Sequence, residues 1–202
     1  MTDYVALEEI KHTLELSNLT YADNDLSLAI TAASRGIDDY CGRQFTSGGT
    51  AEVRYYTACH ASYLEIDDLI SMGTLQSDYN GDGTFETTWT AGTDYVLEPQ
   101  NAPAYAKPYD KIRILYPRTS LRFPIYVGSV KVTGQFGWAT PPAAIKQATS
   151  IMATRLLKRS RDATFGVVGV GFDNVAVRIP TVDPDVKFLL DPYLKGGGVM
   201  VA

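Results

Sequence analysis

The chain changes its hydrophobic pattern twice, and this change is what most restricts how it can fold. Residues 1–48 and 139–202 carry apolar side chains at helical spacing, whereas residues 49–138 contain short runs of Tyr, Thr, Val and Ile between Gly, Pro, Asn and Asp. The first pattern is typical of helices and the second of strands. The sequence therefore predicts an α+β fold, in which a helical body of about four helices carries an inserted small antiparallel β domain.

Start and stop signals place the helices. We expect a short helix around residues 5–14, a longer one that Gly42 ends, a third over residues 143–159, and a last one with Asp183 as N-cap and Pro184 at its first position. Residues 160–182 are expected to form a glycine-bearing loop or hairpin. In the second helix the apolar residues that recur at helical spacing are Leu26, Ile30, Ala33, Ile37 and Cys41.

Composition excludes several classes of protein. The 202 residues are 45% hydrophobic and 20% charged, and the longest nearly apolar run, residues 165–172, is far too short to span a bilayer, so no membrane segment is expected. No secretory signal is visible, and the two cysteines form no disulfide framework, which fits folding in a reducing cytoplasm. A net charge of -5 argues against a general nucleic-acid binder, whose affinity would come from Lys and Arg.

The stretch "SDYNGDGTFETTW", residues 77–89, resembles a calcium loop. Asp78, Asn80, Asp82 and Glu86 fall at ligand positions, but the twelfth position, where an EF-hand has its bidentate carboxylate, is Trp89. The flanks have strand chemistry, and the Asn-Gly and Asp-Gly dipeptides favour a hairpin turn. A hairpin connection is therefore expected, with these four residues as weak metal candidates only.

Other catalytic and ligand-binding patterns are absent from the sequence. His12, Cys41, Cys59 and His60 could supply four zinc ligands, but they lack the paired spacing of zinc sites. No GxSxG elbow occurs, and the glycines of residues 166–174 lead into a strand pattern instead of a helix that could bind phosphate. We therefore expect no catalytic residues and no cofactor.

The helix predicted over residues 143–159 has more apolar surface than one flank of a small domain ordinarily buries. Ile151 and Leu157 lie off its main apolar stripe, and several basic residues lie close to that stripe. These basic residues could extend over the core with their charges in water, or the helix could face a second protein. The main stripe is Ile145, Ala148, Thr149, Met152 and Leu156.

In its succession of motifs the chain resembles the head-tail connector, or adaptor, proteins of tailed bacteriophages. The resemblance covers nearly the whole length, and its individual motifs are only moderately specific. The residues that carry it are "LEEIKHTL", "LSLAITAASRGIDDYCGRQF", "NGDGTFET" leading to "DYVLEPQNA", "VTGQFGW", "PAAIKQATSIMATRLLKR" and "DPDVKFLLDPYL".

The resemblance implies a structural virion protein and no enzyme. Connectors form a ring, twelve subunits by resemblance, that joins the portal to a tail-side stopper or tail protein and leaves a channel through which genomic DNA passes without sequence-specific binding. The resemblance implies a place at the head-tail interface of the virion, after assembly in the host cytoplasm. The β insertion is longer than in the smallest connectors, so its role is open.

A ring subunit needs a partner interface, and we expect it along the third helix and the loop that follows. Residues 160–176 are a candidate segment that orders on docking, and the glycine-rich tail is a second one. Two other classes of function stay open: a calcium- or carbohydrate-binding β module on a helical scaffold, and an enzyme with an unrecognised site. The expected interface residues are Ile151, Arg155, Leu157, Lys158, Arg159, Arg161, Phe165 and Phe172.

Overall fold

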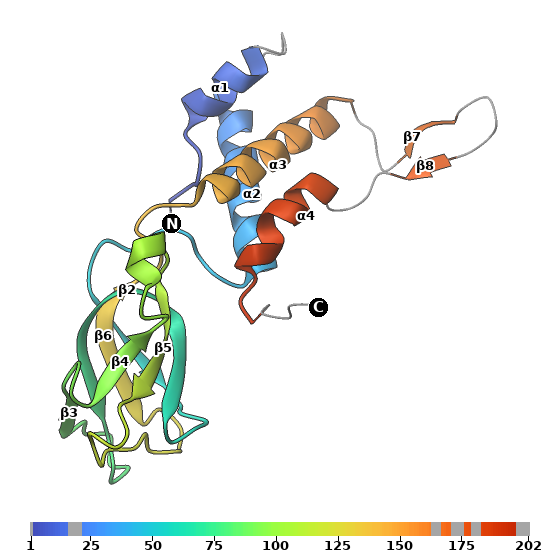
Figure 1. The fold of residues 1–202 in the computed structure, drawn as a ribbon. Helices are drawn as coiled ribbons and strands as arrows, with labels where there is room; N and C mark the ends of the chain where they lie inside the picture. Colours follow the sequence, from blue (N-terminus) through green and yellow to red (C-terminus); the bar gives the residue numbers. More distant parts are fainter. Residues whose placement is uncertain (1, 16–21, 163–166, 171–175, 179–182, 197–202) are drawn as a thin grey trace. The chain divides into compact units, whose positions relative to one another are not determined.

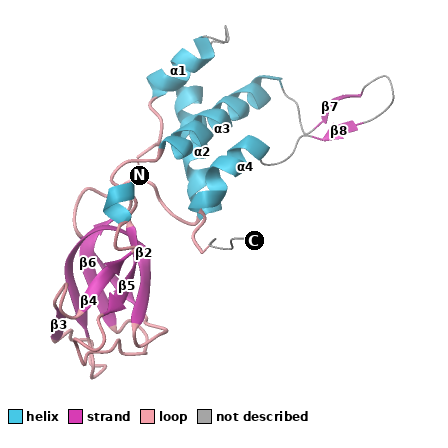
Figure 2. Ribbon diagram, viewed as in Figure 1, coloured by secondary structure: helices cyan, strands magenta, loops and turns pink. Residues whose placement is uncertain are grey.

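The computed structural model describes residues 2–15, 22–162, 167–170, 176–178 and 183–196, and the predicted α+β fold is confirmed in it (Figures 1 and 2). The chain divides into two compact units. The helical unit comprises residues 1–43 and 141–202, and the β unit comprises residues 44–140; the expected boundaries were 48/49 and 138/139. Of the described helices, none is both long and apolar enough to cross a membrane.

The helical unit contains four α-helices among its described residues. They are α1 (Leu7–Glu15), α2 (Asp23–Cys41), α3 (Ala143–Asp162) and α4 (Pro184–Leu190), and a short 3-10 helix, η2 (Asp191–Tyr193), follows α4. The apolar residues predicted for α2 are all buried. Gly42 ends α2 in the left-handed conformation, with its N–H donating to the Asp38 carbonyl. Asp183 caps α4 by accepting a hydrogen bond from the Asp185 N–H at 3.0 Å, as expected.

The buried face of α3 differs from the predicted stripe at its C-terminal end. Ile145, Thr149, Ala153 and Leu157 are buried, and Leu157 is 4% exposed, whereas Leu156 is 40% exposed. The prediction that Leu156 continues the buried stripe and Leu157 lies off it is wrong. Steps of four residues rotate a ridge by about 40° per step, and such ridges pack into grooves of a neighbouring helix, so the buried face drifts along α3.

The β unit is built on one antiparallel sheet. Its strands are β1 (Glu52–Tyr56), β2 (Tyr63–Ser77), β3 (Thr87–Trp89), β4 (Tyr95–Glu98), β5 (Tyr109–Ile114) and β6 (Val130–Phe136), and a 3-10 helix, η1 (Ala102–Tyr105), follows β4. The order is β1-β6-β2-β5-β4, with β3 also paired to β2. The inward-facing apolar residues of these strands form a single core.

Strand β2 is long enough to serve both halves of this sheet. Its first part pairs with β5 and its second part with β6, and the register shifts between Leu69 and Ser71 and again between Met72 and Thr74. Such irregularities bend a strand. Gly134 of β6 accommodates the close approach, because a Cβ there would lie 2.5 Å from the Ser71 carbonyl oxygen.

Two further hairpins were expected from the sequence. Strands β2 and β3 pair antiparallel on either side of residues 78–86, which confirms that this stretch is a hairpin connection. In the C-terminal part, β7 (Val167–Val170) pairs antiparallel with β8 (Ala176–Arg178), which agrees with the expected loop or hairpin.

Candidate partner interfaces

The predicted interface on α3 is partly accessible. Lys158 and Arg159 are exposed, and Ile151 and Arg155 are partly buried. The Arg155 guanidinium lies 3.8 Å from the Asp183 carboxylate and so links α3 to the start of α4. Leu157 packs inside the helical unit and offers no surface to a partner. Phe165, Phe172 and the side chain of Arg161 lie outside the described residues.

The outward side of α2 is a second accessible surface, which the sequence reasoning missed. Leu28 is 72% exposed although α2 is well packed on its other side. At 100° per residue, Asp25, Ala32 and Asp39 lie within about 60° of Leu28, and all three are exposed. The signal was present in the sequence, because Leu28 falls opposite the stripe that contains Ala33.

Helices α2 and α3 differ in charge. Helix α2 contains four Asp and one Arg, whereas α3 contains five Lys or Arg and one Asp. Its first turn includes Asp23, which pairs with Lys11 of α1 at 2.9 Å, and its last turns include Asp38, which pairs with Arg35 at 3.2 Å. Asp25 and Asp39 are exposed on the same helix. The helical unit therefore presents an acidic and a basic surface on different helices.

One end of the β unit exposes large apolar side chains. Tyr79, Tyr116, Ile125 and Val127 are all exposed, with Val127 at 87%. They lie in the loops of residues 78–86 and 115–129 (Figure 1), which we call the loop end. Monomeric proteins rarely expose contiguous apolar patches of large size without a partner.

Hydrogen bonds fix the loops of the loop end to one another. The Tyr79 hydroxyl donates to the Arg122 carbonyl at 2.5 Å, and the Tyr126 hydroxyl donates to the Asp78 carbonyl. The Gly128 N–H donates to the Thr57 hydroxyl at 3.0 Å. These contacts are between residues far apart in sequence, so the exposed apolar side chains are presented by an ordered surface.

The four weak metal candidates meet at the tip of the β2–β3 hairpin. Carboxylate oxygens of Asp78, Asp82 and Glu86 lie within 4.8 Å of one another, and the Asn80 amide donates to Glu86 at 2.6 Å. Asp78 accepts hydrogen bonds from the backbone N–H groups of Asn80, Gly81 and Gly83 at 3.1, 2.7 and 2.9 Å. These contacts stabilise the turn itself.

The same contacts set the charge state of Asp78. Burial opposes its ionisation, but the hydrogen bonds from the N–H groups of Gly81 and Gly83 favour the carboxylate and bring its pKa below the usual value. The Asp82 pKa is also lowered, because the Thr84 hydroxyl and N–H donate to its carboxylate. Both groups therefore carry a negative charge at neutral pH, and the loop end has an acidic hairpin beside its apolar residues.

Potential zinc ligands do not gather in the described residues. The carboxylates of the hairpin are the one group of metal-ligating side chains that the described part brings together. Cys41 is buried in α2, and burial raises the pKa of its thiol to about 11, so it stays protonated at neutral pH. His60 stacks on Tyr63, with ring centroids 4.6 Å apart.

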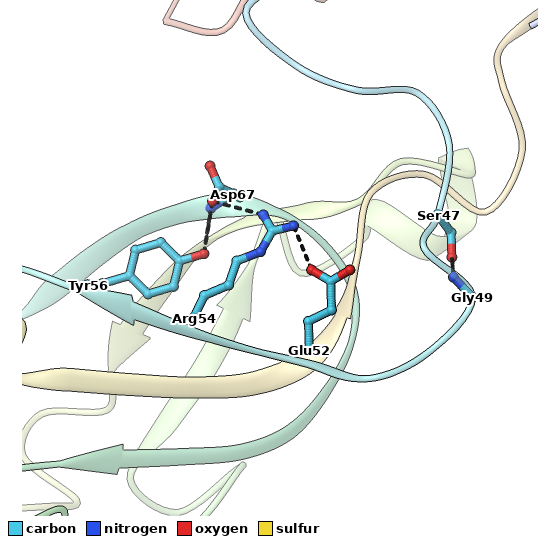
Figure 3. Close-up of polar contacts among 6 residues, drawn as sticks. All are labelled: Ser47, Gly49, Glu52, Arg54, Tyr56 and Asp67. Atoms are coloured by element: carbon cyan, nitrogen blue, oxygen red, sulfur yellow. Dashed lines mark hydrogen bonds and ion pairs between the residues drawn. The ribbon is translucent and has the colours of Figure 1, made fainter. Parts of the chain in front are cut away.

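A polar cluster closes the β unit along β1 (Figure 3). The Arg54 guanidinium donates to Asp67 of β2 and to Glu52, each at 3.0 Å, and the Tyr56 hydroxyl donates to Asp67 at 3.1 Å. The guanidinium also lies 4.1 Å from the centre of the Phe136 ring. Burial and the Asp67 charge raise the pKa of Tyr56 to about 12, so its hydroxyl remains a donor at neutral pH.

This cluster has a structural role at a sheet edge. Strand β1 is the end strand of the sheet order and pairs with β6 alone. Inward-pointing charged side chains are one means by which proteins prevent an edge strand from pairing with another chain. Arg54 is such a residue, and its pair with Asp67 ties β1 to the first half of β2, which is not its sheet neighbour.

Replacing Arg54 by methionine is expected to lower the free energy of unfolding of the β unit by about 1 kcal/mol, since the partly exposed ion pairs and the cation–π contact are lost while the apolar stem remains. Urea denaturation followed by tryptophan fluorescence measures the change. Arg113→Met is the matched control, because Arg113 pairs with Glu98 at a more exposed position and should matter less. Equal midpoints for the two variants would contradict the assigned role.

Comparison with known proteins gives matches in structure alone. No protein-family model matches the chain, and no curated protein matches it. Among solved structures, a chain from the neck of an empty gene transfer agent (GTA) particle computed with C6 symmetry is 17% identical, with a TM-score of 0.57, covering 95% of this chain and 89% of that one. A chain from the neck of a native GTA particle computed with C12 symmetry is 16% identical, with a TM-score of 0.53, covering 96% and 93%.

A third match is a chain from the virion of a native GTA particle. It is 18% identical, with a TM-score of 0.53, and the alignment covers 95% of this chain and 89% of that one. The likeness extends over both the helical and the β unit, because so little of the chain is left out. The connector-like architecture expected from the sequence is therefore confirmed at the level of the fold.

Proposed function

We propose that this chain is a non-enzymatic structural protein of the neck of a tailed phage-like particle. Copies of the chain form a ring between the portal and a tail-side stopper or tail protein, and DNA passes through the ring. The observation that carries the proposal is the match, over about 95% of the chain, to neck chains from particles computed with C6 and C12 symmetry. A ring of twelve would be compatible with both symmetries.

Physical properties of the chain support this function. A closed ring needs two different patches on each subunit, one for each neighbour. The helical unit offers an acidic surface on α2 and a basic surface on α3. The net charge of -5 also suits a conduit, because a strongly basic lumen would bind the phosphates of the moving DNA.

The loop end of the β unit is, in this proposal, the surface for a non-identical neck protein. Protein interfaces are enriched in aromatic residues, and their fully buried centres are more apolar than the rest of the surface. Tyr116 and Val127 are the most exposed members of the loop end. They are held on ordered loops, so a partner could bind them without first ordering the chain.

Assembly can be tested with the purified chain and a purified portal. Light scattering over a wide concentration range should show self-association to a ring-sized species, either with the chain alone or once the portal is added, because some rings assemble only on their partner. The portal, immobilised on a resin, should retain the chain. A species that stays monomeric at every concentration and is not retained by the portal would refute the proposed function.

A further inference from the structure

We infer that neighbouring copies in the ring meet head to tail, with the outward face of α2 on one copy against the outward face of α3 on the next. This inference rests on the proposed ring and adds which two surfaces form the contact. The α2 face consists of Asp25, Leu28, Ala32 and Asp39, and the α3 face consists of Gln147, Ile151, Arg155 and Lys158, with Arg159 beside it.

The α2 face has the composition of an interface. Leu28 is a large apolar side chain with 72% of its surface in water, and Ala32 leaves room beside it for a partner's side chain. Asp25 and Asp39 stand on either side of Leu28 along the helix, and both are exposed. An apolar centre with charges around it is the usual arrangement at protein interfaces.

The N-terminal segment covers a different side of α2. The Tyr4 N–H donates to the Ser34 hydroxyl at 3.3 Å, and the Arg35 guanidinium donates to the Thr2 carbonyl at 3.2 Å. The Thr31 hydroxyl donates to Asp3 at 3.0 Å. The side of α2 that carries Leu28 and Asp39 therefore stays open for a partner, while the side next to it is occupied by the chain itself.

The α3 face is the complement of the α2 face. At 100° per residue, Gln147, Arg155 and Lys158 lie within about 40° of Ile151, and Arg159 lies about 80° away. Ile151 is the apolar residue of this face, and Arg155, Lys158 and Arg159 give it positive charge. An acidic face with an apolar centre and a basic face with an apolar centre complement each other in charge.

The packing of the helical unit directs the two faces away from each other. Helices α2 and α3 pack against each other in the helical unit, and a Cβ on Gly36 of α2 would lie only 3.5 Å from the Met152 side chain of α3. Each face lies opposite the buried side of its own helix. A subunit cannot join its own two faces, but successive copies can, and such a heterologous contact closes into a ring when the rotation allows it.

Charge reversal on each face tests the inference. The acid-reversed chain carries Asp25→Lys and Asp39→Lys, and the base-reversed chain carries Lys158→Glu and Arg159→Glu. In either chain alone, every contact between copies juxtaposes like charges, so the concentration needed for ring assembly should rise at least about tenfold. Assembly is measured by light scattering and native mass spectrometry, with and without purified portal.

The decisive sample is an equal mixture of the two reversed chains. In an alternating ring, each Lys-bearing α2 face meets a Glu-bearing α3 face, and each unaltered α2 face meets an unaltered α3 face, so every contact is complementary again. The mixture should form rings that contain the two chains in equal numbers. A single chain that carries all four substitutions should also assemble with itself, and it should not join the unaltered chain.

Controls separate folding and general charge effects from the contact itself. Circular dichroism should show the same helical content for all chains. A control with Glu65→Lys and Asp110→Lys changes two exposed acidic residues of the β unit and should assemble as the unaltered chain does. If both reversed chains assemble normally, or if the mixture fails although each chain is folded, the inference is wrong. If the unaltered chain forms no ring even with the portal, the proposed function falls and the inference falls with it.

Discussion

The Gly137→Ala variant is expected to lose more than about 3 kcal/mol of the free energy of unfolding of the β unit. Gly137 follows β6 and has φ = +101°, a conformation that L side chains rarely adopt. An added Cβ would overlap the Thr46 carbonyl oxygen and lie 3.0 Å from its carbonyl carbon. Because both obstacles are backbone atoms, a side-chain rotation cannot relieve the clash.

The matched control for this prediction is Gly128→Ala. Gly128 also has a positive φ, of +69°, but a Cβ there would meet nothing within 4 Å. Only backbone strain is expected, which amounts to about 1 kcal/mol. Both tryptophans, Trp89 and Trp138, belong to the β unit, so their fluorescence in a urea titration reports its unfolding. Similar midpoints for the two variants would show that the chain leaves β6 along a different path.

The second large effect is expected in the helical unit, from Leu157→Ala. Leu157 is 4% exposed, and truncating a buried leucine to alanine costs about 2–5 kcal/mol through lost burial and the cavity that remains. Leu156→Ala, one position away, should cost less than about 1 kcal/mol, since Leu156 is already 40% exposed. Thermal melting followed by the helical circular dichroism signal measures both variants.

This pair of variants also tests how α3 faces its neighbours. If Leu156→Ala were the more destabilising variant, the helix would be rotated from the orientation described here, and the assignment of Ile151 and Lys158 to the outward face would change with it. With the orientation described, Leu157→Ala should also impair ring assembly indirectly, because it loosens the helix that carries the basic face. Leu156→Ala should leave that face in place.

Much of the fold follows from local signals in the sequence. The stripe of α2 and the stop at Gly42, the N-cap Asp183, and the Asn-Gly and Asp-Gly turn after β2 were all predicted, and the structure confirms them. Each of these features depends on residues within a few positions of one another. Such signals can be evaluated without knowing the rest of the fold.

The features that were missed depend on contacts between distant segments. The runs "SYLEI" and "LISMGTLQ" were predicted as separate strands, but they form one bent strand, β2, because β5 and β6 pair with its two parts. The drift of the buried face on α3 depends on its packing with α2. The closure of the β unit by Arg54 and Asp67 joins residues of strands that are not neighbours in the sheet.

The candidate interfaces were likewise only half visible in the sequence. The basic residues of α3 stand out because they follow an apolar helix, and Lys158 and Arg159 are exposed as an interface requires. Leu28 did not stand out, because a leucine in a helix is expected to be buried, and its exposure is evident only once the buried side of α2 is known. The loop end likewise required the tertiary contacts that join Tyr79 to residue 122 and Tyr126 to Asp78.

The central claim, that this chain is a ring subunit of a neck, is tested most directly by electron microscopy of the purified chain mixed with its purified portal. The account predicts that class averages show an added closed ring, coaxial with the portal and with an open channel at its centre. Portal particles without any added ring, in the presence of a large excess of the folded chain, would contradict it.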